Sequence, residues 1–191
     1  VPLVDQDVTL GPFTDSHSFT VGDIEIEPFG LAWHRPRWDA VFALAVIFGG
    51  AAQLFAGFQE MKVGNNFGFC AFTGYGAFWI SFALILVSKR YGIFPAEGND
   101  VGWFLIAFTL FTAILWGASL RVHKAMAITF SLLLIGFILL DLEHFGFPGL
   151  KTLAALELIL CALSALYMMA HVIYLDLAGK DVFPVGTPWV R

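Results

Sequence analysis

Five long apolar stretches, joined by short connections that carry most of the charge, limit how this chain can fold. They cover about residues 39–58, 67–88, 102–119, 125–140 and 153–175. Each is close to the roughly 20 residues that an α-helix needs to cross the hydrocarbon core of a bilayer. The pattern therefore predicts an all-α membrane protein with five transmembrane helices, antiparallel from one to the next because the links are short. The stretch at 125–140 is the shortest, and we expect it to stand upright or to extend into its flanking residues.

The composition indicates that lipid, not water, surrounds this bundle. Hydrophobic residues make up 59% of the 191 residues and charged residues 13%, whereas a soluble domain carries about 25% charged residues. One core of this size leaves more apolar surface than water can cover. The net charge of -5 comes mainly from the N-terminus, which argues against nucleic-acid binding. Lys and Arg divide evenly between the two ends of the spans, so the positive-inside rule leaves the orientation open.

The N-terminal segment differs in character from the rest of the chain. Residues 1–30 carry six acidic side chains and no Lys or Arg. Apolar and polar residues alternate over 19–21 and 24–26 on either side of a Gly-Asp pair that suits a type II′ turn. This pattern fits a β-hairpin or an extended tail. We divide the chain into this polar segment (1–37), a transmembrane domain (38–178) and a C-terminal tail (179–191).

Polar side chains inside the apolar stretches are the first candidates for a functional site. Gln53 lies well inside the first stretch, where its amide must find hydrogen-bond partners. Thr73 and Tyr75 in the second stretch, and Thr129 and Ser131 in the fourth, raise the same question. Each fits an interhelical hydrogen bond, and together they fit a narrow, weakly polar conduit for a small solute. Small residues in the first two stretches would let those helices approach closely, within one chain or between protomers.

Charged and capping residues give three further candidates. Glu157 is a full charge inside the last stretch, which indicates a proton site or an ion pair, although it lies near enough to the helix start to reach the interface. Asn65 fits a helix N-cap, and such a helix start can also hold a carboxylate. Asp141, Glu143 and His144 lie close together, but no second cluster at helical spacing completes a metal site. The two cysteines form no CxxC pattern, and no cofactor motif is present.

Three segments carry a resemblance to a known family: residues 47–57 (IFGGAAQLFAG), 64–68 (GNNFG) and 71–79 (AFTGYGAFW). They resemble the acetate uptake transporters, also called succinate–acetate permeases, and the similarity covers about residues 38–186. It implies six-helix protomers that assemble as hexamers, each with a path for small monocarboxylates that is proton-coupled or channel-like. The family opens with an Asn-Pro-Ala-Pro-Leu-Gly segment that leads into a first helix. Residues 27–31 resemble that segment only faintly, so either this sequence lacks the piece that carries the first helix, or a five-helix scaffold serves another use.

The resemblance also implies roles for individual residues. Tyr75 matches an aromatic residue that narrows the path, Leu132 an apolar constriction residue, and Gln53 a polar residue that lines the path. Asn65 and Thr73 lie within the matching segments. An apolar narrowing with few polar groups passes small solutes and dewets readily.

Two functions are consistent with these features. The first is a transporter or channel for acetate-like carboxylates, including succinate, that is linked to protons and forms a homo-oligomer in the inner (cytoplasmic) membrane of a prokaryote. The second is a structural subunit of a larger membrane complex that docks a partner through residues 1–37. We expect no enzymatic activity and no bound cofactor or metal.

Overall fold

The computed structural model describes residues 24–27, 30–33, 42–93 and 98–190. Five of its helices are long and apolar enough to cross a membrane: Phe42–Lys62, Asn66–Tyr91, Asn99–Ser119, Lys124–His144 and Pro148–Ala178. The predicted bundle of five membrane-spanning helices is therefore confirmed.

The first span is not a regular α-helix along its whole length. It contains the π-helix η2 (Ala45–Ala52) and continues as α2 (Gln53–Lys62). The other helices are α3 (Asn66–Tyr91), α4 (Gly98–Ser119), α5 (Lys124–His144), the 3-10 turn η3 (Pro148–Leu150) and α6 (Lys151–Ala178).

Helix ends are set by capping groups more than by the limits of the apolar stretches. α3 and α6 both end at a glycine, Gly92 and Gly179, with a φ of 63°. This left-handed conformation favours glycine and lets the next amide bond a terminal helix carbonyl. α5 continues through residues 141–144, beyond the apolar stretch that predicted it. The shortest expected span thus reaches membrane length by including polar flanking residues.

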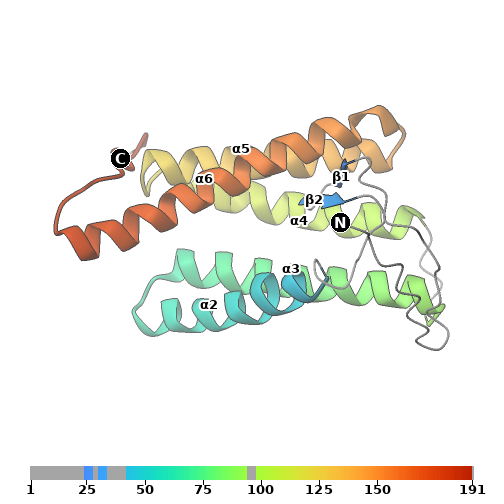
Figure 1. The fold of residues 1–191 in the computed structure, drawn as a ribbon, viewed down its shortest axis with the longest axis horizontal. Helices are drawn as coiled ribbons and strands as arrows, with labels where there is room; N and C mark the ends of the chain where they lie inside the picture. Colours follow the sequence, from blue (N-terminus) through green and yellow to red (C-terminus); the bar gives the residue numbers. More distant parts are fainter. Residues whose placement is uncertain (1–23, 28–29, 34–41, 94–97, 191) are drawn as a thin grey trace, which may run out of the picture.

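The helices form two layers (Figure 1). η2, α2 and α3 make up one layer, and α4, α5 and α6 the other. Within the first layer, helix backbones touch: a Cβ added at Gly76 would lie 2.9 Å from the Gly50 carbonyl oxygen. A Cβ added at Gly57 would lie 2.9 Å from the amide nitrogen of Thr73. Glycines on η2, α2 and α3 therefore pack the chain against itself, because they let the backbones approach.

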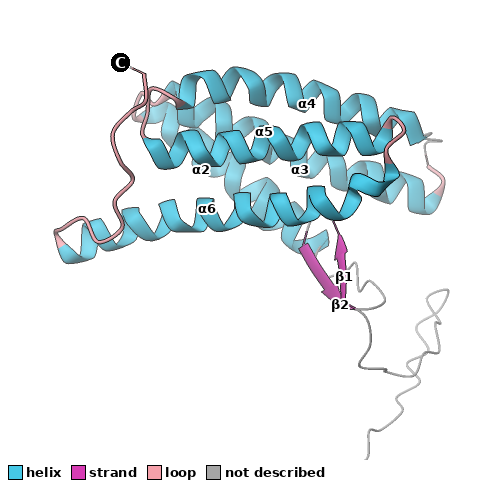
Figure 2. Cartoon of the chain, turned by 90° about the horizontal axis from the view of Figure 1, so that it is seen from above, coloured by secondary structure: helices cyan, strands magenta, loops and turns pink. Residues whose placement is uncertain are grey.

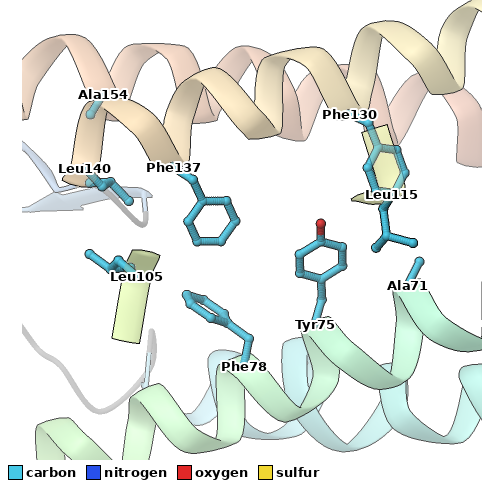
Figure 3. Close-up of a cluster of buried hydrophobic side chains, with 9 residues drawn as sticks. All are labelled: Ala71, Tyr75, Phe78, Leu105, Leu115, Phe130, Phe137, Leu140 and Ala154. Atoms are coloured by element: carbon cyan, nitrogen blue, oxygen red, sulfur yellow. The ribbon is translucent and has the colours of Figure 1, made fainter. Parts of the chain in front are cut away.

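Aromatic side chains fill the space between the two layers (Figure 3). Phe78 of α3 is central, with ring centroids 5.3 Å from Phe104, 4.8 Å from Phe108 and 5.5 Å from Phe137. The backbones of α3 and α4 approach each other at few points. Rings, and not backbone contacts, therefore set the spacing between the layers. We call this region the aromatic layer.

A short antiparallel hairpin precedes the first span and packs against α6 (Figure 2). β1 (Ile24–Glu27) pairs with β2 (Gly30–Trp33), with Ile24 opposite Trp33. The sequence predicts a strand at 24–26, and the structure contains it, but the described partner strand follows it in the chain. The strand expected at 19–21 lies outside the described residues, as does the turn expected at 22–23. Alternating residues indicate which segments can form strands but do not select the partner.

The C-terminal tail returns along one end of the bundle (Figure 2). The Val185 carbonyl accepts a hydrogen bond from the Ala125 amide at the start of α5. The Leu120 carbonyl accepts hydrogen bonds from the amides of Trp189 and Val190. The tail thereby links the end of α6 to the connection between α4 and α5.

Candidate functional site

Tyr75 places a hydroxyl group within the aromatic layer. Its side chain is 8% exposed, and the hydroxyl lies 2.9 Å from Oγ1 of the fully buried Thr112 on α4. The Tyr75 ring stands edge-on to Phe111, with centroids 5.5 Å apart, and lies 6.3 Å from the ring of Phe130 on α5. Figure 3 shows the hydroxyl pointing away from α3 towards the opposite layer. A polar pair therefore lies among rings contributed by three helices.

Thr112 is a site residue that sequence reasoning missed. A threonine inside an apolar helix commonly bonds a carbonyl of its own helix, so it carries little signal. Its contact with Tyr75 joins residues 37 positions apart. A weak signal is present, because Leu105, Thr112 and Ser119 recur every seven residues and mark the buried face of α4.

Gln53 lies at the junction between the π-helix and α2. It is at the level of Tyr75 along the bundle, because the neighbouring Leu54 packs against Gly76. Its side chain is half-buried and forms no hydrogen bond within the part of the chain that the structure describes. The π-helix that precedes it contains no proline, and π-turns within helices occur frequently at functional sites. The Gln53 amide is therefore available to a solute.

Asn65 caps α3 and binds a carboxylate of its own chain. Its Oδ1 accepts a hydrogen bond from the Gly68 amide at 3.0 Å, and its Nδ2 donates to Glu60 Oε2 at 2.6 Å. Glu60 thus occupies the helix start where the sequence allows a bound anion. Asn65 lies about 15 Å from Tyr75 along α3, at about 1.5 Å per residue. The structure therefore places it at the helix end and not beside the hydroxyl pair.

Thr73 and Leu132 lie near the aromatic layer without joining the hydroxyl pair. Thr73 donates a hydrogen bond to the Phe69 carbonyl at 2.6 Å, and its backbone lies against Gly57 of α2. Leu132 is half-buried on α5, two positions after Phe130. Thr73 thus braces α3 against α2, while Leu132 is on the helix that faces Tyr75.

Two hydroxyl groups of α5 point in different directions. Thr129 Oγ1 lies 2.9 Å from Ser164 Oγ of α6. Ser131 Oγ accepts a hydrogen bond from Trp116 Nε1 of α4 at 2.9 Å. These contacts are the interhelical hydrogen bonds that the sequence allows for both residues, and neither of them reaches the Tyr75 hydroxyl.

Glu157 is buried within the bundle. Its side chain is 9% exposed, and both carboxylate oxygens are without a hydrogen-bond partner among the described residues. They face α5 at Gly136, where an added Cβ would lie 2.5 Å from Oε2. The alternative that Glu157 reaches the interface is therefore wrong, because Gly136 leaves room for the carboxyl group inside the bundle.

Asp141 supplies a second buried carboxyl group. Its Oδ2 accepts a hydrogen bond from Thr109 Oγ1 at 2.6 Å, and its Oδ1 has no partner among the described residues. The sequence places Asp141 in a connection, because the apolar stretch ends at Leu140. Its burial follows from the extra turn of α5, which the apolar pattern does not show.

His123 lies outside the spans and caps the start of α5. Its Nδ1 accepts a hydrogen bond from the Met126 amide at 3.0 Å. Burial lowers the pKa of His123, and the nearby His171 lowers it further. The neutral imidazole, which can accept this bond, is therefore favoured in the folded chain.

Comparison with known proteins identifies relatives of this chain. A model described as the GPR1/FUN34/yaaH family matches residues 36–178. The succinate-acetate/proton symporter SatP of Escherichia coli is 30% identical over 148 residues, which cover 76% of this chain and 79% of SatP. Acetate permease A of Emericella nidulans is 40% identical over 116 residues, covering 56% of this chain and 39% of the permease.

A solved structure agrees with the sequence matches. The structure of the bacterial acetate channel SatP superposes with a TM-score of 0.74 at 30% identity, and covers 78% of this chain and 83% of that chain. The resemblance expected from residues 47–79 is confirmed, and the bundle is that of an integral membrane protein. The chain belongs to the GPR1/FUN34/yaaH family.

Proposed function

We propose that the chain conducts small carboxylates, with acetate as the main solute and succinate as a larger one, through the aromatic layer at Tyr75 and Thr112. The observation that carries this proposal is their hydroxyl pair, 2.9 Å apart and enclosed by rings. Relatives named as a succinate-acetate/proton symporter, an acetate permease and an acetate channel support the solute class.

The chemistry of the pair suits a carboxylate. When the Tyr75–Thr112 hydrogen bond opens, both hydroxyls can donate to the oxygens of a solute that has lost its water. The positive edges of the surrounding rings add a weak attraction for an anion. Apolar walls on either side disfavour a continuous column of water. A carboxylate that has lost its water therefore regains hydrogen bonds within the aromatic layer.

Further residues complete the proposed path. Leu132 is included because it lies on α5, the helix that carries Phe130, and Gln53 offers an unpaired amide at the level of Tyr75. Asn65 lies at one end of the path, and Thr73 supports the wall that α3 forms. Glu157 is the proton site that makes transport proton-linked, since its buried carboxyl group can exchange a proton without a permanent counter-charge.

Acetate counterflow into proteoliposomes tests the path. Tyr75→Phe and Thr112→Val each remove one hydroxyl and keep the shape, so we expect flux to fall about tenfold, as the loss of about 1.4 kcal/mol would produce. Tyr91→Phe removes a hydroxyl from the same helix at a side chain that is 60% exposed, and serves as the control. Unchanged flux in both path variants would rule out the hydroxyl pair as the conducting site.

The outer face of the first span supports assembly into a homo-oligomer, a hexamer in this proposal. Its exposed apolar side chains are Leu44, Ile47, Phe48 and Phe55, with exposures between 62% and 71%. Both lipid and a second protomer can cover such a face. Purification from the inner membrane in mild detergent, with mass determination, tests this assembly. Foreign subunits at equal stoichiometry would instead favour a complex subunit, with the β1–β2 hairpin as the docking element.

A further inference from the structure

Helix α5 separates two environments that meet its opposite sides. Phe130 and Phe137 point into the aromatic layer, as Figure 3 shows. Thr129 and Gly136, each one position earlier, face α6, where Gly136 adjoins the carboxyl group of Glu157. Glu157 therefore lies against the Gly136 face of α5, while Ala154 and Leu158 of its own helix pack with the aromatic layer.

Polar side chains continue from Glu157 along the α5-facing side of α6. They follow at helical spacing: Cys161, Ser164 and His171. Cys161 lies one helical turn after Glu157, and its Sγ donates to the Thr129 carbonyl at 3.5 Å. Ser164 Oγ then lies 2.9 Å from Thr129 Oγ1. The thiol and the two hydroxyls can each accept and donate a proton.

The interval from Ser164 to His171 contains Met168, whose Sδ lies 3.9 Å from Thr129 Oγ1. A thioether carries no exchangeable proton, so a proton crosses this interval on a transient water molecule. Beyond it, His171 Nδ1 lies 3.1 Å from Asp181 Oδ1. The Asp181 side chain is 48% exposed and reaches water at the end of the bundle. His171 and Asp181 therefore form the end of the row that reaches water.

The other direction from Glu157 holds one carboxyl group of α5, Asp141, whose Oδ2 accepts a hydrogen bond from Thr109 of α4. Ala154, Ala155 and Leu140 are between 0% and 3% exposed and fill the space between α5 and the start of α6. η3 carries no titratable side chain. β1, which also packs against α6, includes Glu25 and Glu27 in its sequence. Exchangeable side chains within the described interface of α5 and α6 thus lie on one side of Glu157.

We propose that Glu157 exchanges its proton with the membrane face that carries the C-terminal tail, along the α5–α6 interface. This inference rests on the proton-linked function proposed above. Glu157 and His171 are about 21 Å apart along α6, at about 1.5 Å per residue. That distance is most of the roughly 30 Å hydrocarbon core. α5 forms a wall of both routes and can couple them.

Infrared spectroscopy of the full chain in liposomes tests this route without any transport assay. A protonated Glu157 has a carbonyl band that shifts when the carboxyl proton is replaced by deuterium, and Glu157→Gln identifies the band by removing it. After transfer to heavy water, we expect exchange to slow at least about tenfold in the Thr129→Val/Ser164→Ala double variant, equivalent to about 1.4 kcal/mol of added barrier. Ser131→Ala removes a hydroxyl from the α4-facing side of α5 and is the matched control, with unchanged exchange.

Two results would overturn the proposal. One is exchange at the parental rate in the double variant, which would send the proton by another route. The other is the absence of a Glu157-dependent band at every pH tested, which would remove Glu157 as the proton site. Failure of acetate counterflow alone would contradict the transport function and leave the infrared result standing.

Discussion

The two sides of α5 carry different kinds of side chain, although they belong to one helix. Towards α3 the helix presents Phe130 and Phe137, and large rings keep the two backbones apart. Towards α6 it presents Thr129 and Gly136, and the helices meet through small and polar groups. Because lipid tails are as apolar as these side chains, neither contact gains from the hydrophobic effect as it would in water.

This difference indicates what each interface can do. Ring pairs are favourable both stacked and edge-on, and both arrangements occur in this layer, so rings can shift between them to admit a small solute. Close packing at Gly136 has little tolerance, because the carboxyl group of Glu157 and the side chain of Leu158 fill the available space. The first interface is therefore suited to a path, and the second to a fixed proton site. The following experiments test this contrast, from the largest expected effect to the smallest.

Gly136→Leu gives the largest effect. The new side chain would meet Glu157 Oε2 and Leu158 Cδ2, which already lie 2.5 Å from an added Cβ. We expect the free energy of unfolding to fall by about 3 kcal/mol or more, because a larger side chain does not fit into a filled interface. Thermal unfolding in detergent measures this loss. The control is Gly117→Leu, because an added Cβ at Gly117 meets nothing within 4 Å.

Phe137→Ala probes the aromatic side of α5. Its side chain is 4% exposed, so its removal leaves a gap against Phe78. We expect the free energy of unfolding to fall by about 3 kcal/mol, the low end for such truncations, because neighbouring rings can move into the space. We also expect altered acetate flux, unlike in the Gly117→Leu control. A stability loss greater than that of Gly136→Leu would reverse the contrast between the two interfaces.

The sequence predicts the parts of this arrangement that depend on composition and on local pattern. Apolar length identified the five spans, and the matching segments around Tyr75 identified the family. The apolar pattern could not predict Thr112 or Gly136, because their roles depend on contacts with other helices. It also placed Asp141 in a connection, since apolarity stops one turn before α5 does. The predicted roles of Gln53, Asn65, Thr73, Leu132 and Glu157 remain for the flux and infrared experiments to decide.

His123 caps α5, the helix that forms both interfaces, so a change in this cap affects both. Its pKa is lowered in the folded chain, so unfolded chains bind the proton more readily. The cap therefore contributes fully above the unfolded pKa of about 6.5, and its contribution declines as the pH falls from there towards the lowered pKa. On acidification we expect the free energy of unfolding to fall by about 1 kcal/mol, which is typical for the loss of an N-cap. Thermal unfolding at neutral and acidic pH measures it.

The matched variant for this cap is His123→Asn, because asparagine caps a helix at any of these pH values. Its loss of stability on acidification should be smaller than that of the parent chain. His144→Gln changes a histidine at the other end of α5 and is the control. An equal loss in His123→Asn and the parent would show that the cap does not titrate.

The smallest expected effect is the coupling energy of the hydrogen bond between Thr129 and Ser164. A double-mutant cycle with Thr129→Ala and Ser164→Ala should give a coupling energy of about 0.6 kcal/mol, as is usual for hydrogen bonds between membrane helices. Both hydroxyls also have carbonyl partners on their own helices, Ala125 for Thr129 and Cys161 for Ser164, which limits what the pair can add. A coupling near zero, combined with slowed exchange at Glu157, would mean that the pair conducts protons without holding the helices together. A coupling well above 1 kcal/mol would instead make the α6 side of α5 a structural contact first, and the contrast with the aromatic side would then be one of strength.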